Sequence, residues 1–199
     1  MNLIHGDRSY IEISSSFFED FIVNGSLYID KTQFVEHILD KTSKVLLITR
    51  PRRMGKSLNL DTLHTFLDCT RDTKHLFKDL YIETSPVWET VNKYPVIYMD
   101  FKDLTPENYK QRFKDMVRKL SAKLIPINHF DDIMKRYYFT DDFSTTILYD
   151  FSEALYNHYG IRPYIIIDEY DNLFMSSVAS REFADYRQWL RNILSPALK

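Results

Sequence analysis

One short segment combines the residue types that phosphate binding requires. It is Arg50-Pro-Arg-Arg-Met-Gly-Lys-Ser57. In such a turn a glycine lets backbone N–H groups curl around phosphate oxygens, a lysine reaches the β- and γ-phosphates, and a hydroxyl ligates Mg²⁺. Because Gly55, Lys56 and Ser57 supply these three parts, the sequence predicts a phosphate-binding turn that leads into a helix.

The segment differs from the standard pattern G-x-x-x-x-G-K-[S/T] at its first position. Arginine stands at position 50, and Pro51 has no N–H to donate. Since guanidinium groups pair bidentately with phosphate, the arginines are expected to offset the lost donors. The predicted nucleotide-binding residues are Arg50, Arg52, Arg53, Met54, Gly55, Lys56, Ser57 and Leu58. Taken alone, such an arginine run is more typical of a solvated basic turn or a nucleic-acid patch.

Two adjacent carboxylates end an apolar run further along the chain, Ile165-Ile-Ile-Asp-Glu169. Side chains alternate along a strand, so Asp168 and Glu169 are expected to leave its carboxyl end in different directions. Asp168 is predicted to ligate Mg²⁺ together with Ser57, and Glu169 to orient or deprotonate an attacking water. The predicted catalytic residues are Glu169 and Lys56. In isolation the pair would be interpreted as a turn cap followed by an exposed glutamate.

Alternating strands and helices are predicted to position these residues. The run at residues 44–49 is apolar without alternation, which indicates a strand buried on both faces of a parallel sheet. Further strands are predicted at 96–101 and 164–168, and helices from Lys56 onward and at about 106–125, 130–138, 142–159 and 181–194. This order predicts a three-layer α/β fold with right-handed crossovers. The candidate residues would then lie at the carboxyl edge of the sheet, where α/β ligands generally bind.

The segment before this core is expected to pack on it as an N-terminal extension of residues 1–40, with the core at 41–199. Residues 26–29 suit a brief strand, and Asp30 is the predicted N-cap of a helix at 32–39. Asp30, Lys31 and Thr32 are interpreted mainly as this helix start, with nucleotide contact as the alternative.

The composition excludes several classes of protein. The net charge of the 199 residues is −2, so a nucleic-acid role would require a local basic patch. Cys69 is the sole cysteine, which excludes an internal disulfide or a zinc ribbon and favours a reducing cytoplasm. No apolar run approaches the roughly 20 residues of a membrane helix, and a membrane partner is not expected. The four glycines form no dinucleotide-binding fingerprint.

Several strings in chain order resemble the bacterial AAA-ATPase-like family. They are Tyr28-Ile-Asp-Lys-Thr32, the segment from Leu47 to Leu60, Tyr94-Pro-Val-Ile-Tyr-Met-Asp-Phe101, Ile165-Ile-Ile-Asp-Glu-Tyr-Asp171 and Leu190-Arg-Asn-Ile-Leu194. The Arg-Pro-Arg-Arg-x-Gly-Lys-[Ser/Thr] form of the loop is distinctive of that family, so the missing first glycine matches its pattern. Met54 stands where an aromatic residue is common.

The resemblance implies a P-loop NTPase sheet of the additional-strand class, ordered 5-1-4-3-2, with ATP and Mg²⁺ as cofactors. The strands ending at Thr49, Phe101 and Asp168 would be strands 1, 2 and 3. No candidate for strand 4 precedes Lys199, so a truncated P-loop core is expected. Family members often carry a C-terminal restriction-nuclease-like domain, through which nucleic acid would be a partner, and this chain contains no such domain.

The leading hypothesis is an ATP-binding domain whose intact relatives couple hydrolysis to a conformational change. Whether this chain is itself an ATPase depends on whether strand 4 and later segments are dispensable. Two alternatives stay open. One is a nucleic-acid module that grips backbone phosphates with the arginine loop, and the other is a non-hydrolysing nucleotide-binding remnant.

Overall fold

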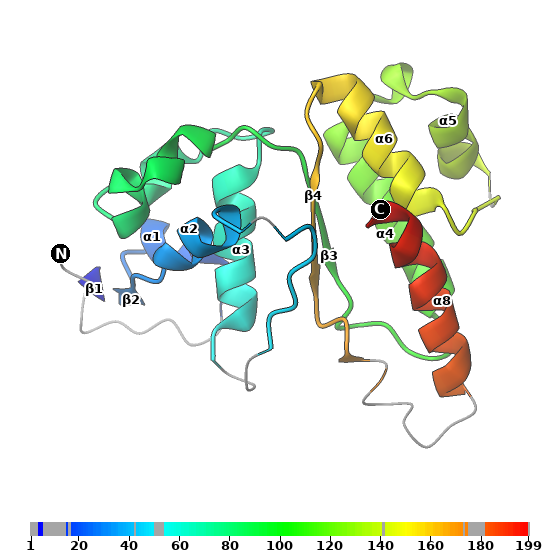
Figure 1. The fold of residues 1–199 in the computed structure, drawn as a ribbon, viewed down its shortest axis with the longest axis horizontal. Helices are drawn as coiled ribbons and strands as arrows, with labels where there is room; N and C mark the ends of the chain where they lie inside the picture. The colour runs from blue at the N-terminus through cyan, green and yellow to red at the C-terminus, as the bar shows by residue number, and fades with distance from the viewer. Residues whose placement is uncertain are drawn as a thin grey trace. The chain divides into compact units, whose positions relative to one another are not determined.

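The computed structural model describes most residues of the chain. The described ranges are 4–5, 15, 17–41, 43–49, 54–140, 142–172, 174 and 182–198. The chain divides into two compact units, Met1–Val96 and Ile97–Lys199 (Figure 1). Each unit buries its own set of apolar side chains.

The first unit is mainly helical. Its elements in chain order are β1 (Ile4–His5), α1 (Phe18–Val23), β2 (Tyr28–Ile29), α2 (Gln33–Leu39), α3 (Lys56–Leu67), and the 3-10 helices η1 (Lys74–Phe77), η2 (Tyr81–Thr84) and η3 (Pro86–Thr90). β1 and β2 form a two-stranded antiparallel sheet in which Ile4 pairs with Ile29. The brief strand and the two helices predicted for this part of the sequence are confirmed, although the strand is shorter than predicted.

Helix α3 supplies the largest share of the first unit's core. Of the apolar side chains whose spacing predicts one face of this helix, Leu60, Leu63, Phe66 and Leu67 are buried and Leu58 is half-buried. The Phe66 ring meets the edge of Phe77 at a centroid distance of 5.4 Å, and Phe77 stacks on Phe18 at 4.8 Å. Asp61 of α3 is also buried, and its Oδ2 accepts a hydrogen bond of 2.7 Å from the Phe18 N–H. The same helix therefore packs the core and satisfies the first N–H group of α1.

Two buried polar side chains fix the loop between β2 and α2. Asp30 Oδ1 accepts hydrogen bonds from the N–H and the hydroxyl of Thr32, at 2.8 and 2.7 Å. Asp30 Oδ2 accepts one of 2.6 Å from the Tyr81 N–H, and Thr32 Oγ1 accepts one of 3.1 Å from the Ile82 N–H. The N-cap of α2 is Thr32, so the prediction of Asp30 at that position is wrong. Asp30 instead closes the preceding turn and anchors η2.

Residues 44–49 do not form the predicted strand. Val45, Leu46 and Leu47 are 53%, 40% and 66% exposed, and residues 45–49 have no regular secondary structure. A β-prone run becomes a strand only beside a neighbour that completes its backbone hydrogen bonds. No strand of the described residues pairs with this run. The prediction of a strand buried on both faces is therefore wrong, because the local preference has no partner.

The second unit contains a small parallel sheet and long helices. The sheet pairs β3 (Val96–Asp100) with β4 (Tyr164–Asp168), and in Figure 1 both strands run in the same direction. The helices are α4 (Tyr109–Leu124), α5 (Asp132–Phe139), α6 (Ile147–Tyr159) and α8 (Glu182–Ala197). α6 packs against α4, α5 and α8, and Gly160, at a φ of 72°, ends it as predicted. All six elements were predicted from the sequence and are confirmed.

The mixed α/β class is confirmed, whereas a P-loop NTPase fold is not. Neighbouring positions for β3 and β4 agree with the adjacency of strands 2 and 3 in the family order. The sheet of the predicted three-layer fold was expected to include a strand at 44–49, and that strand is absent from the described residues. In the part of the chain that the structure describes, no helix has the length and apolar character to cross a bilayer.

Replacing Asp30 with alanine is expected to destabilise the first unit by about 2–4 kcal/mol, because the buried N–H groups of Thr32 and Tyr81 would lose their acceptor. Urea unfolding followed by circular dichroism measures this free energy. The control is Asp40→Ala at the exposed end of α2, for which a change below about 0.5 kcal/mol is expected. A loss for Asp30→Ala no larger than that of the control would show that the turn does not depend on this carboxylate.

Candidate functional site

The candidate phosphate turn enters helix α3 at Gly55. Gly55 is the N-cap of α3 and has a left-handed backbone with φ 71° and ψ 29°. Glycine adopts this conformation without the penalty that a Cβ imposes. The Asn59 N–H donates to the Gly55 carbonyl at 3.0 Å and closes the first helical turn. The predicted turn from glycine into a helix is therefore present, with Lys56 and Ser57 at its first two helical positions.

The first turn of α3 provides the electrostatics that an anion requires. The leading N–H groups of a helix have no partner within the helix, and the helix dipole places positive potential at this end. Lys56, Ser57 and Leu58 are half-buried, and Met54 is 56% exposed. Lys56 thus adds a positive charge to a helix end that already favours anions. Arg50, Arg52 and Arg53 lie outside the described residues.

A second lysine lies beside this turn. A Cβ placed on Gly55 would be 3.7 Å from the Nζ of Lys31. Lys31 lies between Asp30 and Thr32, whose hydrogen bonds fix the backbone of this loop. The sequence did not reveal this proximity, because residues 31 and 55 are brought together only by packing within the first unit.

The second group of predicted site residues lies at the carboxyl edge of the small sheet in the second unit. Asp168 is the last residue of β4 and is 3% exposed, and its Oδ1 accepts a 2.9 Å hydrogen bond from the Glu169 N–H. The Phe101 N–H donates to the Asp168 carbonyl at 3.0 Å, which continues the pairing of β3 with β4. Asp100 ends the neighbouring strand β3. Parallel pairing therefore brings Asp100, Asp168 and Glu169 to one edge.

Glu169 has a backbone conformation that is unusual for a residue other than glycine. Its φ is 51°, in the left-handed region that costs a non-glycine residue about 1–2 kcal/mol. The Asn172 N–H donates to the Glu169 carbonyl at 3.0 Å and holds the turn in place. At this turn Asp168 is buried and Glu169 is half-exposed. Such strain is concentrated at functional sites, where the surrounding structure maintains it.

Asn172 braces this acidic edge, a role that no motif in the sequence indicates. Its Nδ2 donates to the Lys102 carbonyl at 2.8 Å and lies within 3.4 Å of the carbonyls of Phe101 and Leu104. The loop after β4 is thereby tied to the loop after β3. An asparagine in a polar loop is common in turns of every kind, so its position after Asp-Glu-Tyr-Asp could not identify it.

The charges at this edge repel one another. Partial burial raises the pKa of Asp100, and the carboxylates of Asp168 and Glu169 raise it further, while a hydrogen bond from the Lys102 N–H opposes both effects. That bond is 2.8 Å long and ends at Asp100 Oδ1, so this carboxylate caps the loop that follows β3. A cation bound at this edge would relieve the repulsion.

The described residues contain no group of three or more His, Cys, Asp or Glu side chains arranged to hold a metal. Magnesium keeps several waters and is usually held by one or two carboxylates together with the phosphates of the substrate. Ser57 and Asp168 are donors of the required oxygen type, and their use by a single ion stays a prediction.

Comparison with known proteins adds a family assignment to this geometry. A family model described as "Predicted AAA-ATPase" matches residues 12–199. An uncharacterized protein in the vnfD 5′ region of Azotobacter chroococcum mcd 1 is 27% identical over 169 residues, which cover 84% of this chain and 30% of that protein. The chain thus spans less than a third of the length of this relative. No solved structure matches the chain.

Asp100→Asn is expected to raise the Tm near neutral pH, because the ionised carboxylate is less favourable in the folded chain than in the unfolded chain. The gain should shrink as the pH falls through the raised pKa of Asp100, since the unsubstituted side chain is then neutral as well. The amide oxygen still accepts from the Lys102 N–H. Scanning calorimetry across this pH range measures the effect.

The matched control for this measurement is Asp185→Asn, an exposed carboxylate on α8. Its removal is expected to give no rise in Tm, because a negative charge near the start of a helix is mildly favourable. An Asp100→Asn variant with an unchanged or lower Tm at neutral pH would contradict the repulsion inferred at the sheet edge.

Proposed function

Because the chain belongs to the AAA-ATPase-like family, we propose that it binds ATP at the turn formed by Gly55 and the first turn of α3. The membership confirms the resemblance seen in the sequence and suggests nucleotide binding as the general function. The observation that carries the proposal is the left-handed Gly55 immediately before Lys56 and Ser57 at the start of a helix. That conformation leads the chain directly into a helix start, and a helix N-terminus followed by Lys-Ser is the arrangement that binds a phosphate chain.

Each residue of the turn has a proposed role. Lys56 would neutralise charge on the β- and γ-phosphates, and Ser57 would donate its hydroxyl oxygen to Mg²⁺. Lys31, whose ammonium group lies beside Gly55, would add a second positive charge on the phosphates. The arginines of the loop, Arg52 and Arg53 above all, would be auxiliary phosphate ligands. The Mg²⁺ ion, when bound, would offset the charge that develops on the phosphate oxygens.

Hydrolysis of ATP is the proposed reaction, and Asp168 and Glu169 would have different roles in it. Asp168, buried and hydrogen-bonded to the Glu169 N–H, would serve as a fixed oxygen ligand. Glu169 would accept a proton from the water that attacks the γ-phosphorus, while the bond from the γ-phosphorus to the bridging oxygen breaks and ADP leaves. The difference in burial supports separate roles, because Asp168 is buried while Glu169 is half-exposed.

Lys56→Ala is expected to abolish ATP binding, because the variant loses the only charged side chain of the Gly-Lys-Ser segment. Isothermal titration calorimetry with Mg-ATP measures the affinity directly. Lys78→Ala removes an exposed lysine from the same unit and should leave the affinity within about twofold of the unsubstituted chain. Equal affinity in the Lys56→Ala variant would refute the assignment of the turn. Steep salt dependence without any Mg-ATP effect would instead support phosphate binding by a nucleic-acid module.

Glu169→Gln is expected to leave ATP affinity unchanged and to lower turnover by about 100-fold or more, as the loss of a general base does. Phosphate release is the readout for turnover, and calorimetry is the readout for binding. Glu107→Gln, an exposed carboxylate of the same unit, is the control and should alter neither. Equal loss of binding and turnover would reassign Glu169 to metal binding. Binding without turnover in the unsubstituted chain would identify a non-hydrolysing nucleotide-binding domain.

A further inference from the structure

Helix α4 carries a concentration of positive charge that the total charge conceals. Its sixteen residues contain six basic side chains and one carboxylate, Asp115, in a chain whose net charge is −2. The basic residues are Lys110, Arg112, Lys114, Arg118, Lys119 and Lys123. Its apolar residues face the core, and Phe113 and Val117 are buried there. Lys110, Arg112, Lys119 and Lys123 are exposed, whereas Lys114 and Arg118 are half-buried.

Three of these basic residues form a stripe along the helix. Arg112, Lys119 and Lys123 are spaced by seven and four residues, which places them on one face of an α-helix. All three are exposed. A row of cations of this length is suited to a polymer with repeated negative charges rather than to a single small anion.

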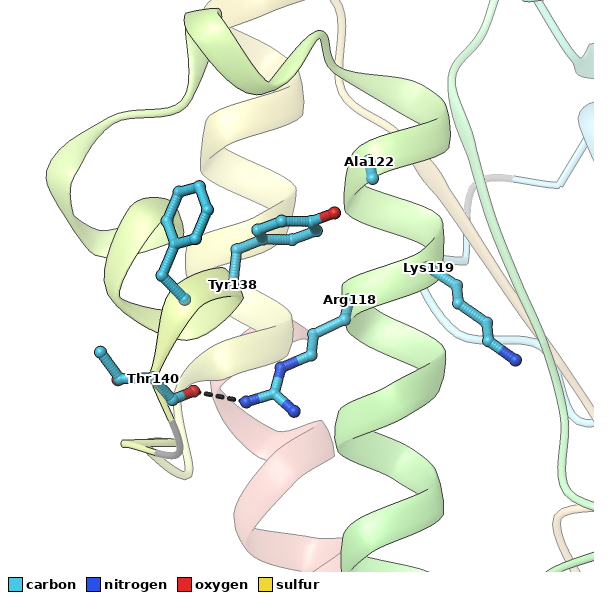
Figure 2. A pocket seen from close by; sticks show the side chains of 6 residues that line it. Arg118, Lys119, Ala122, Tyr138 and Thr140 are labelled. Atoms are coloured by element: carbon cyan, nitrogen blue, oxygen red, sulfur yellow. Dashed lines mark hydrogen bonds between the residues drawn. The ribbon is translucent and has the colours of Figure 1, made fainter.

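A pocket opens beside this stripe. It has a volume of about 800 Å³ and is lined by Arg118, Lys119 and Ala122 of α4 and by Tyr138, Phe139 and Thr140 at the end of α5. Figure 2 shows Tyr138 reaching across toward the α4 side of the pocket, while Lys119 extends from the opposite side of that helix. Arg118 therefore supplies the positive charge inside the pocket, facing the aromatic side chains of α5, and the Lys119 ammonium group belongs to the stripe outside it.

Arg118 of α4 holds the carboxyl end of α5 in place. Its Nε donates to the Tyr137 carbonyl at 3.3 Å, and its Nη2 donates to the Thr140 carbonyl (Figure 2). Its guanidinium also lies 4.9 Å from the centroid of the Phe143 ring. These contacts hold the carboxyl end of α5 against α4 and place a positive charge at a helix end whose dipole is negative. Arg118 is therefore a positioning residue, and the stripe supplies the exposed charges.

Phe139 is the exposed aromatic residue of the pocket. It is 67% exposed, and its ring contacts Tyr138 edge-to-face at a centroid distance of 5.0 Å. Tyr138 in turn packs edge-to-face on the buried Phe130 at 5.5 Å. The phenylalanine is thus supported on one edge, while most of its surface is open to solvent. An accessible aromatic ring beside cations is the arrangement on which unpaired bases stack.

We propose that the surface formed by α4 and the end of α5 binds single-stranded nucleic acid. Arg112, Lys119 and Lys123 would contact successive phosphates, and a base would stack on Phe139. Base-paired nucleic acid hides its base faces, so it could use only the cationic stripe. An acidic polypeptide has the charge for the stripe but gains nothing comparable from the aromatic ring. This surface is distinct from the turn at Gly55, and its function does not depend on ATP binding.

The test is fluorescence anisotropy of a labelled oligothymidylate with the 199-residue chain. Three phosphate contacts predict a slope of log affinity against log salt of about −2. The Lys119→Glu/Lys123→Glu double variant should weaken binding by at least about tenfold and flatten the salt slope. Phe139→Leu, which keeps the apolar bulk and removes the ring, should weaken binding by about tenfold with the salt slope unchanged.

The control is the Lys78→Glu/Lys93→Glu variant, which changes the net charge equally at exposed lysines of the first unit. It should bind the oligothymidylate within about twofold of the unsubstituted chain, and circular dichroism should show that all variants remain folded. The proposal is overturned if the control weakens binding as much as the α4 variant, or if the oligothymidylate does not bind. It is also overturned if Phe139→Leu has no effect, or if duplex DNA or polyglutamate competes as well as unlabelled oligothymidylate.

Discussion

The burial of helix α3 is the constraint on which the first unit depends. Polar groups enclosed in a core must find partners, because an unsatisfied buried group costs about 1–3 kcal/mol. Asp61 meets this requirement by accepting the Phe18 N–H, and the Thr62 hydroxyl donates to the Leu58 carbonyl at 2.7 Å. Asp68, at the end of the helix, accepts from the N–H of Thr70 and from Arg71. The helix is thereby held at both ends and along its length. A turn at its N-terminus begins from a rigid support, which a phosphate-binding turn requires.

The acidic edge of the second unit achieves rigidity in another way. It rests on two short strands and on the loops that follow them, and the Asn172 amide crosses between those loops. The Tyr186 hydroxyl donates to the Tyr170 carbonyl at 3.1 Å and secures the same loop from α8. These bonds maintain the left-handed backbone of Glu169 and the proximity of Asp100 to Asp168, both of which are unfavourable on their own. A site that tolerates strain and like-charge repulsion is typical of residues arranged for binding or chemistry.

Charge is distributed unevenly in the second unit. Carboxylates gather at the ends of β3 and β4, whereas α4 carries six basic residues and one acidic residue. Opposite charges on separate surfaces cancel in the total, so a net charge of −2 gives no sign of either one. Dissolved salt screens interactions between exposed charges that are more than about 10 Å apart. The potential at a surface therefore depends mainly on the charges within that distance. Local arrangement therefore decides which ligands each surface attracts.

The sequence by itself determined the local features of this protein. Periodicity located α3, α4, β3 and β4, the Gly-Lys-Ser segment located the turn at Gly55, and motif order identified the family. Tertiary structure decided the features that depend on contacts distant in the chain. It left residues 44–49 without a strand partner, placed Lys31 beside Gly55, and made Asn172 the brace of the acidic edge. The physical reason is that helix propensity and turn chemistry act within a few residues, whereas a strand or a charged cluster exists only when another segment supplies the other half.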